Sequence, residues 1–474
     1  MNSDNPKSSE LHVAVFAFPF GTHATPLLNI TKRLASFAPN VIFSFFSTYE
    51  SNTKTFAGSI KGLNEDDHDQ NSLMHNIKAY DVWDGLPKGY VFKGNPLEII
   101  ELFMVSAPAT LRKAVAEAEE DRGRKVSCMF GDAFLWFVVE MAEEKRVPWV
   151  PAYTSEEHSL SAHVYTDLIR EKIGMQDIAE KRKDELLEFV PGMSKIRVKD
   201  LPDGIVMGNS DSFFAKMVHQ MARVLPRAAA VCVSTCAEFN SAALNDLKSK
   251  LPNLLCLGPL SLMMPPPKTP DNYNCIAWLD KQQEEAHNNS AVVAYVSFGS
   301  VVRPSPGEIA ALAQGLEASG VKFIWSLKDN FKEHLPHGFL ENNKEKGMVV
   351  SWAPQTDILA HKTVGVFITH FGHNSIMESI VSEVPMIGRP FIGEQKLNGR
   401  LVEAMWEIGL EVEGGVFTKE GVVKSLERIV WGNEGKKMKE NIRGQKKLLE
   451  KAISTEGSCN DDFKKLSDVV SKSC

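Results

Sequence analysis

The chain has 474 residues, of which 43% are hydrophobic and 24% charged, and its formal net charge is −7. This length exceeds one ordinary hydrophobic core and suggests roughly two to four domains. The negative charge argues against a general nucleic-acid-binding surface, and no apolar run reaches the roughly 18 residues that a membrane-spanning helix requires.

The first ten residues, MNSDNPKSSE, are polar and contain no apolar core. They do not resemble a secretory signal, so we expect a disordered tail at residues 1–10 of a cytoplasmic protein. The seven cysteines are scattered and form no paired CxxC motif. Cys232 and Cys236 make a lone CxxxC inside an apolar run, without the second ligand pair of a structural zinc site. We therefore expect reduced thiols and no metal.

The first half of the chain alternates strand and helix patterns. LHVAVFAF (11–18) is almost continuously apolar, as buried parallel strands are, and the loop PFGTHATP separates it from the helical pattern PLLNITKRLASFA. Further strands are expected at VIFSFFST, KVSCMFGD, VPWVPAYT, AVCVST and LLCLGP, with helical spacing in AFLWFVVEMAEEK. This alternation predicts a parallel sheet with helices on both faces.

Composition changes after Gly258, where PLSLMMPPPKTPDNYN is rich in proline and polar residues and is typical of a linker. The strand–helix pattern then restarts with AVVAYVSFGS, GEIAALAQGLEAS, KFIWSL, GMVVSW and VGVFITH, and the tail from about Gly435 is a charged helical stretch. We predict two Rossmann-like, doubly wound α/β domains, at 11–258 and 276–474, joined by a linker at 259–275. Ligands would bind between them, beyond the carboxyl ends of the strands.

Two polar residues follow predicted strands in the first half. His23 lies on the loop after the first strand, where a histidine acts as a general base near neutral pH or simply caps the next helix. Asp132 ends a later strand, where aspartate is also a common helix N-cap. If the two strand ends are neighbours, Asp132 can orient His23 and stabilise its imidazolium form. From position alone, His23 and Asp132 are therefore either a catalytic pair or two helix caps.

The second half carries further candidates at strand ends. The loop SFGS (297–300) follows a strand, and its small residues let a phosphate approach the backbone, although many tight turns look alike. Trp352 follows another strand and offers a ring on which a base can stack, or it is an ordinary core tryptophan. Glu394 and Gln395 follow RPFIG, a predicted strand end, and suit sugar hydroxyls or form a solvated loop.

A third strand end has the densest set of polar residues. His370 and Gly372 precede a predicted helix whose N-terminus suits phosphates, and Asn374 and Ser375 add side-chain donors there. Glu378 lies one turn further along and can accept hydrogen bonds from a diol such as ribose. The glycine fingerprint GxGxxG and the phosphate loop GxxxxGK[ST] are both missing, which lowers the alternative of a nicotinamide oxidoreductase on the same layered fold.

The chain resembles plant family-one UDP-sugar glycosyltransferases, in particular the flavonoid 3-O branch. The resemblance extends over nearly the whole chain from His12 and is carried by HVAVFAFPFGTHATPLL, DGLPKGYVFKGNP, DAFLWF, HVYTDLIREKIG, VSFGSV and the block from WAPQ to EQKLNGR. It implies the two-domain GT-B fold with a central cleft. The acceptor would bind the N-terminal domain and the UDP-sugar the C-terminal domain.

The resemblance also implies how the candidate residues divide between catalysis, donor and acceptor. His23 is implied as the base that deprotonates an acceptor hydroxyl, with Asp132 as its partner. The acceptor is implied to contact Thr22 and His163. The UDP-sugar is implied to contact Thr154, Ser300, Trp352, Ala353, Gln355, His370, Gly372, His373, Asn374, Ser375, Glu378, Glu394 and Gln395.

Within this donor set, Trp352 would stack on uracil, Glu378 would hold the ribose, and the helix N-terminus would hold the diphosphate. Glu394 and Gln395 would face the sugar, whose 6-hydroxyl Thr154 would reach. The acceptor oxygen would attack the anomeric carbon opposite UDP and invert it. Helix N–H groups and a histidine can take the developing charge, so we expect no metal and no cofactor beyond the UDP-sugar.

Three positions depart from the family pattern, and we expect them to affect the sugar. Family members usually have tryptophan at His373, glycine at Glu383 and aspartate at Glu394. One extra methylene shifts a carboxylate by about an ångström, which is enough to alter a reaction geometry. The presence of Thr154 and Gln395 favours glucose, with rhamnose close behind.

We therefore expect a monomeric, inverting 3-O-glycosyltransferase for a flavonol or a related flavonoid. Two alternatives remain beside the oxidoreductase. One is a non-catalytic protein that binds a sugar nucleotide or a phenolic, and the other is a glycosyltransferase for a different phenolic acceptor.

Overall fold

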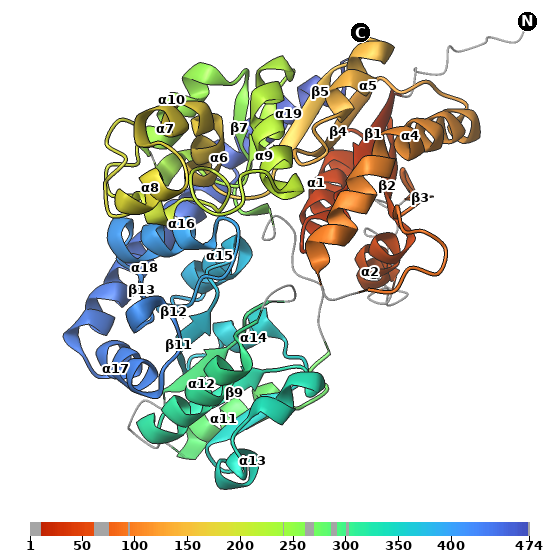
Figure 1. The fold of residues 1–474 in the computed structure, drawn as a ribbon. Coiled ribbons are helices and arrows are strands. Elements are labelled where there is room, and N and C mark those ends of the chain that lie inside the picture. Colours follow the sequence, from red (N-terminus) through yellow and green to blue (C-terminus); the bar gives the residue numbers. More distant parts are fainter. Residues whose placement is uncertain are drawn as a thin grey trace, which may run out of the picture.

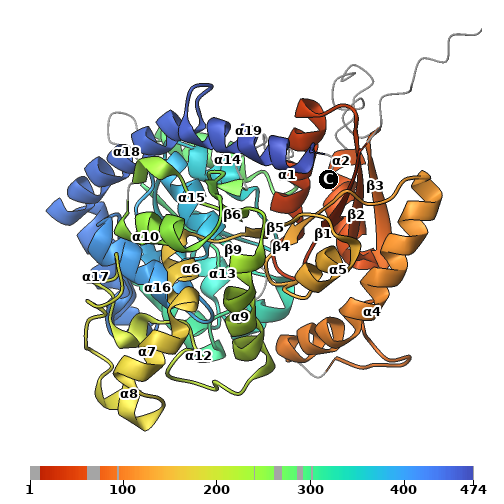
Figure 2. The ribbon, with the colours of Figure 1, turned by 90° about the horizontal axis from the view of Figure 1, so that it is seen from above.

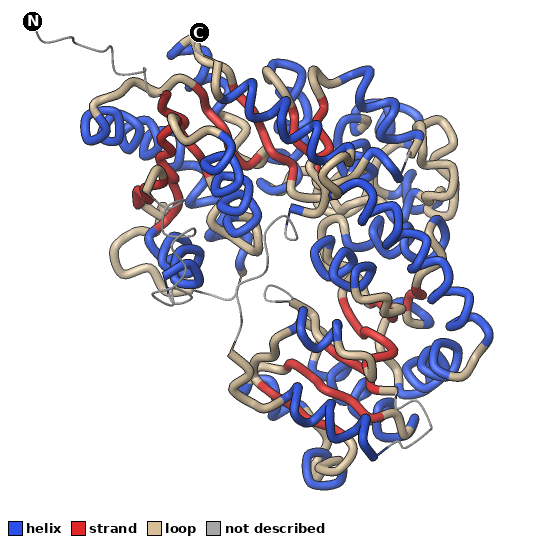
Figure 3. Tube along the Cα trace, turned by 180° about the vertical axis from the view of Figure 1, so that it is seen from behind, coloured by secondary structure: helices blue, strands red, loops and turns tan. Residues whose placement is uncertain are grey.

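The computed structural model describes residues 11–60, 75–92, 95–239, 241–260, 270–285, 292–299 and 303–472. Within these ranges the chain forms two parallel sheets with helices around each, and they lie one above the other in Figure 1 and Figure 3. The arrangement confirms the predicted α/β class with two Rossmann-like domains.

The first sheet is seven-stranded and parallel, in the order β3-β2-β1-β4-β5-β6-β7. Its strands are β1 (Leu11–Phe16), β2 (Val41–Thr48), β3 (Ile77–Val82), β4 (Cys128–Asp132), β5 (Trp149–Tyr153), β6 (Val231–Val233) and β7 (Leu254–Cys256). The strand order reverses between β1 and β4. Their carboxyl ends therefore form the switch point at which doubly wound sheets bind ligands.

The helices of this half connect its strands. They are α1 (Ala24–Phe37), α2 (Tyr49–Ile60), α4 (Pro96–Arg122), α5 (Val138–Lys145), α6 (Glu157–Val164), α7 (Thr166–Ile173), α8 (Asp177–Lys181), α9 (Phe213–Val224) and α10 (Ala242–Lys250). Strand β1 shows why its whole sequence is apolar. Val13 and Val15 belong to the core that contains α1, whereas Ala14 and Phe16 belong to the core that contains Phe103 of α4. A strand covered on both faces cannot alternate with polar residues.

The second sheet repeats the same topology with six parallel strands in the order β10-β9-β8-β11-β12-β13. They are β8 (Val293–Val296), β9 (Lys322–Ser326), β10 (Gly347–Val350), β11 (Val364–Thr369), β12 (Met386–Gly388) and β13 (Gly409–Glu411). Its helices are α11 (Cys275–Glu285), α12 (Pro306–Ser319), α13 (Phe339–Asn342), α14 (Gln355–Ala360), α15 (His373–Val381), α16 (Gln395–Arg400), α17 (Lys419–Val430) and α18 (Asn433–Ile453). The switch point lies between β8 and β11.

The last helix, α19 (Ser458–Val470), returns to the first sheet, and Figure 2 shows α18 and α19 following one another over both halves. Phe463, Leu466 and Val470 are fully buried in the core that also contains α1. Asp462 accepts a 2.8 Å hydrogen bond from the backbone N–H of Cys256 in β7. The charged tail expected from the sequence is thus two helices, and the second completes the core of the other half.

One expected strand is placed differently by the structure. The sequence predicts that RPFIG (389–393) is the end of a strand, but β12 stops at Gly388, before this segment begins. Pro390 has no backbone N–H and cannot continue a ladder, which explains the early end. Glu394 therefore follows a loop and occupies the N-cap of α16.

A smaller apolar cluster joins the two halves at one side. Ile169, Ile173 and Ile196 from the first half pack with Leu397 and Leu401 from the second. In the described part of the chain, no helix combines the length and apolarity needed to cross a membrane.

Candidate active site

His23 lies on the loop between β1 and α1, which turns at Gly21 with a left-handed φ of +62°. Its Nδ1 is 2.7 Å from Oδ2 of Asp132 at the end of β4. The Asp132 side chain is 1% exposed and the His23 side chain 20%, so the carboxylate is buried while the imidazole keeps access to solvent. His23 occupies the N-cap of α1, yet its side chain caps no N–H of the described residues. Simple helix capping therefore does not account for it.

Both oxygens of Asp132 have donors. Oδ1 accepts a 2.9 Å hydrogen bond from the backbone N–H of Phe134, and Oδ2 binds His23. Burial alone would lower the pKa of His23, but the charge and hydrogen bond of Asp132, with a further contribution from the charge of Glu394, raise that pKa above its ordinary value. Asp132 thus supports the protonated form that a general base reaches after it takes a proton.

Thr154, at the end of β5, places its Oγ1 3.1 Å from the same Nδ1 of His23. A neutral imidazole has one N–H, and the shorter contact to a carboxylate assigns it to Nδ1. Nε2 then carries the lone pair and is the atom able to accept a proton. His23, Asp132 and Thr154 lie at or after the ends of β1, β4 and β5, which are neighbours in the sheet.

Aromatic rings surround His23, and the sequence analysis did not select them. The ring centroids of Phe18 and Phe134 lie 5.1 and 4.9 Å from that of the imidazole. Phe20 packs on Phe18 at 5.2 Å and Phe214 on Phe134 at 5.9 Å. Phe18 is buried, whereas Phe20, Phe134 and Phe214 are partly exposed and offer apolar surface beside the base to a flat aromatic molecule. The available signal was the phenylalanines that flank the two predicted residues in FPFGTH and GDAFLWF.

His370 follows β11, is partly exposed, and lies close to two glycines. A Cβ added to Gly372 would lie 2.5 Å from Nε2 of His370, and one added to Gly299 would lie 3.0 Å from its Cε1. Burial lowers the pKa of His370 to about 4, so the imidazole is neutral at physiological pH. A neutral imidazole beside these two glycines can donate one hydrogen bond to an oxyanion, and it carries no positive charge.

The turn between His370 and α15 is held by Phe371. This residue has a left-handed φ of +58°, and its fully buried ring packs on the backbone of Gly388 and Gly399, where any Cβ would clash with it. Asn398 donates a 2.9 Å hydrogen bond to the carbonyl oxygen of Phe371. Among the described residues no side chain caps α15, so the N–H groups of its first turn remain for an anion.

Gln355 connects the strand end after β10 with α15. Its Nε2 donates to Glu378 Oε2 at 2.6 Å and to Ser375 Oγ at 3.2 Å, while its Oε1 accepts from the hydroxyl of Tyr295 at 3.3 Å. Burial raises the pKa of Glu378, and the bond from Gln355 acts against this shift. Tyr295, on β8, is a further residue that the sequence analysis missed. Trp352 is 58% exposed, which excludes the core-tryptophan alternative and leaves a ring face open.

One hydrogen bond joins the two groups of candidates. Asn374, in the first turn of α15, donates from Nδ2 to Thr22 Oγ1 at 3.1 Å. Thr22 immediately precedes His23, so the base and the anion-binding end of α15 lie at the same place. Glu394 also belongs here, because its charge contributes to the raised pKa of His23. The Oε1 atom of Gln395 accepts from two backbone N–H groups of the preceding loop, at 2.8 and 3.2 Å.

The structure shows what two of the three departing residues contact. Glu383 follows the C-terminal end of α15, opposite the anion-binding end, and pairs with Arg443 and Lys446 of α18, at 3.0 Å each. The imidazole of His373 is 6% exposed and lies 2.9 Å from Ser234 of the first half. The expectation that Glu383 adds charge near the sugar is therefore wrong, because it lies at the far end of the helix.

His163 is buried, burial lowers its pKa to about 4, and its Nδ1 has no hydrogen-bond partner among the described residues. Ala353 is buried in the core of the second half. Ser300 lies outside the described residues.

One cluster among the described residues has the spacing of metal ligands. Glu156, Glu157 and His158 bring one ligand atom each within 4.8 Å of one another. Glu156 accepts hydrogen bonds from the backbone N–H groups of His158 and Ser159, at 2.6 and 2.8 Å. These bonds cap α6, which gives Glu156 a structural role.

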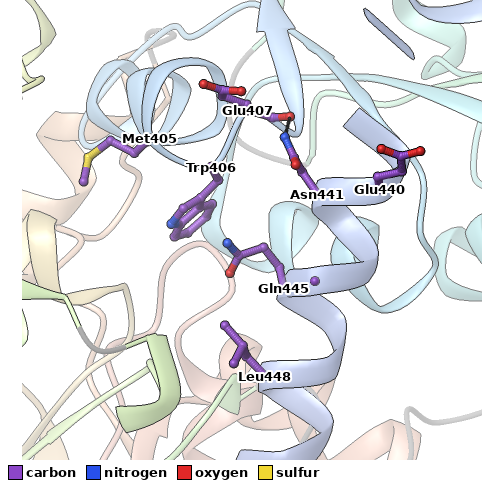
Figure 4. A pocket seen from close by; sticks show the side chains of 8 residues that line it. Met405, Trp406, Glu407, Glu440, Asn441, Gln445 and Leu448 are labelled. Atoms are coloured by element: carbon purple, nitrogen blue, oxygen red, sulfur yellow. Dashed lines mark hydrogen bonds between the residues drawn. The ribbon is translucent and has the colours of Figure 1, made fainter. Parts of the chain in front are cut away.

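A surface pocket of about 520 Å³ lies between the short π-helix η6 (Leu401–Met405) and α18 (Figure 4). Trp406, Gln445 and Leu448 line it, and Asn441 donates to the backbone oxygen of Glu407 at 3.0 Å. The described residues that line this pocket include none of the predicted site residues. The candidate active site therefore remains at the strand ends.

Comparison with known proteins gives consistent results. The family model described as UDP-glucoronosyl and UDP-glucosyl transferase matches residues 98–448. The anthocyanidin 3-O-glucosyltransferase UFGT of Vitis vinifera is 48% identical over 461 residues, covering 97% of both chains. A flavonol 3-O-glucosyltransferase of Arabidopsis thaliana is 46% identical, covering 99% of both. The crystal structure of a UDP-glucose:anthocyanidin 3-O-glucosyltransferase in complex with UDP matches 98% of this chain and 99% of its own, with a TM-score of 0.88 and 39% identity.

Proposed function

Because this chain belongs to the UDP-glucoronosyl and UDP-glucosyl transferase family, we propose that it transfers one sugar from a UDP-sugar to the 3-hydroxyl of a flavonol or related flavonoid. The observation that carries the proposal is the position of the His23–Asp132 pair beside the first turn of α15, where Asn374 bonds Thr22. A base and an anion-binding helix end at one place are the two parts that such a transfer needs.

In the proposed reaction, Nε2 of His23 takes the proton of the acceptor hydroxyl while Asp132 stabilises the imidazolium. The acceptor oxygen forms a bond to the anomeric carbon as the bond from that carbon to the UDP oxygen breaks, which inverts the centre. Charge that develops on the diphosphate meets the N–H groups of α15 and the imidazole of His370. This set of donors supports a reaction without a metal or a further cofactor.

The donor would lie along the second half of the site. Trp352 offers an exposed ring for the uracil, and Glu378 offers a carboxylate for the ribose hydroxyls. Glu394 is the departing residue that remains near the reacting groups, since its charge acts on His23. We propose UDP-glucose as the preferred donor, with UDP-rhamnose second.

The acceptor would lie against the phenylalanines around His23. Phe134 is partly exposed beside the imidazole, and a planar phenolic that stacks on it would place a hydroxyl close to Nε2. We propose that the protein acts as a monomer. None of the six described cysteines forms a disulfide bond and all are buried, which agrees with the reducing cytoplasm, where we place the reaction.

The test is a transfer assay with one flavonol and three donors, UDP-glucose, UDP-galactose and UDP-rhamnose, with product mass as the readout. We expect product with the wild-type protein and no turnover with His23→Ala, although that variant should still bind UDP. The exposed His337→Ala is the control and should keep the wild-type rate. No product with any donor would favour the non-catalytic binding protein, and NAD rather than UDP raising the Tm would favour the oxidoreductase.

A further inference from the structure

The first residue of α15 reaches from the second half of the molecule into the first. His373 belongs to the second sheet's helix, but its Nε2 lies 2.9 Å from the hydroxyl of Ser234, which follows β6 of the first sheet. Both residues are buried, at 6% and 1% exposure. A buried hydrogen bond between two domains is costly to break when one partner is left unpaired.

Ser234 connects His373 to the start of the interdomain segment. Its Oγ accepts a 3.3 Å hydrogen bond from the backbone N–H of Leu260 and lies 3.4 Å from the carbonyl oxygen of Gly258. The hydroxyl has one proton, and the shorter contact directs it to Nε2 of His373. Burial lowers the pKa of His373 to about 4, against the raising effects of Glu157 and the Ser234 backbone, so the imidazole is neutral and can accept that proton.

The first turn of α15 both offers N–H groups to an anion and contacts the loop that carries the base. Gly372 and the following N–H groups form the anion-binding end, and Asn374 bonds Thr22 beside the base. A second set of contacts lies on α16, where Lys396 pairs with Asp203 at 2.7 Å. Together with the Asn374–Thr22 bond, the buried His373–Ser234 bond restrains the start of α15 relative to His23.

We infer that His373 is a positioning residue that holds the donor-binding end of α15 in register with His23 through its bond to Ser234. The inference rests on the proposed function and goes beyond it. It also assigns this departure from the family pattern to the joint between the domains rather than to the sugar. A misplacement of about 1 Å between the reacting groups can lower the rate by about 100-fold. We therefore expect removal of the His373–Ser234 bond to lower kcat.

The experiment measures kcat, KM and UDP affinity for His373→Ala, Ser234→Ala and the double variant. We expect kcat to fall roughly 10-fold or more in each, while the Kd for UDP stays within about 2-fold. Because one bond is removed in all three, the double variant should be no slower than the single ones. His373→Gln, whose carboxamide can bond Ser234, should recover kcat to within about 3-fold of wild type.

The matched control is a second His–Ser pair that lies inside the first half. Nε2 of His12 is 2.8 Å from Oγ of Ser44, and both residues are fully buried. His12→Ala and Ser44→Ala should lower the free energy of unfolding but leave the kcat of the folded protein unchanged. If they lower kcat as much as His373→Ala does, general destabilisation explains the effect and the inference fails.

Other outcomes also decide the question. A His373→Ala variant that loses UDP affinity in step with kcat would make His373 a donor contact, and additive effects of His373→Ala and Ser234→Ala would show that the bond is not their shared role. The coupling between the two residues is measured by urea unfolding as well, which needs no turnover. If urea unfolding shows no coupling between His373 and Ser234, the inference fails. If it shows coupling but the wild-type protein makes no product with any donor, only the proposed function fails.

Discussion

Replacing Asp132 with asparagine tests the catalytic pair most directly, because it removes the charge and keeps the shape. The wild-type carboxylate is 1% exposed and lies 2.7 Å from Nδ1 of His23. A hydrogen bond to a charged group contributes about 1.5–3 kcal/mol. If the transition state has an imidazolium at His23, this loss corresponds to a decrease in kcat of about 10- to 150-fold.

The pH dependence gives the sign of the effect. His23 must be neutral to act as a base, and burial opposed by the Asp132 charge and hydrogen bond leaves its pKa above the ordinary 6.5. The acid limb of kcat/KM in the wild-type protein should therefore lie above pH 6.5. Asp132→Asn removes the main raising influence, so its acid limb should move to lower pH, and the difference in rate should be largest at high pH.

The assay is product formation across pH 5 to 9 with saturating donor, accompanied by calorimetric UDP binding to show that the variant is folded. Thr154→Val is the matched control, since Thr154 contacts the same Nδ1 at 3.1 Å but carries no charge. It should leave the acid limb in place. An Asp132→Asn variant with a rate within threefold of wild type and an unmoved limb would refute the assignment of Asp132.

Three further outcomes are expected. Gly372→Ala should weaken UDP binding by about 10-fold or more in calorimetry, because its Cβ would displace His370, whereas Gly307→Ala, whose Cβ meets no described atom within 4 Å, should not. Glu383→Gly should keep kcat within about twofold, since relief of the left-handed φ of +59° offsets two partly exposed ion pairs; a large loss would return Glu383 to the sugar site. The free energy of unfolding in urea should fall as the pH is lowered from 7 to 5. Burial holds the pKa at about 4 for His163, His370 and His373 in the folded protein, whereas these histidines take up protons at about 6.5 in the unfolded chain. The loss is roughly 2 kcal/mol per group. The raised pKa of His23 offsets part of this loss. A free energy of unfolding that stays constant from pH 7 to pH 5 would contradict the prediction.

Much of the fold follows from short-range patterns in the sequence. The apolar runs at 11–18 and 41–48 predict buried parallel strands because both faces of the sheet are covered, and the structure has β1 and β2 there. The rule that ligands bind at strand ends made His23 and Asp132 candidates, and the family resemblance gave them their catalytic roles. Their contact depends on β1 and β4 being neighbours, which is a property of strand order that the sequence suggests but does not determine.

Contacts between the two halves were beyond sequence reasoning. Ser234 and His373 are 139 residues apart, and nothing in VCVSTC distinguishes the serine from any other residue after a strand. Phe371 was equally hidden, because phenylalanine is not a residue from which a left-handed φ is expected. The first contact depends on how the two halves pack together and the second on packing inside the second half, and local periodicity encodes neither.

A ribosome makes the first domain well before the second, yet α19 keeps the first domain from being finished in that order. Phe463, Leu466 and Val470 belong to its core but leave the ribosome last. At usual synthesis rates, about 10 to 40 s separate the end of the first sheet from these residues. During that interval the apolar surface that α19 will cover, including Phe37, which packs on Phe463, is open to chaperones or to other nascent chains. A fragment that ends at the linker would leave this apolar surface uncovered, so we expect it to be less stable than the first domain is in the whole chain.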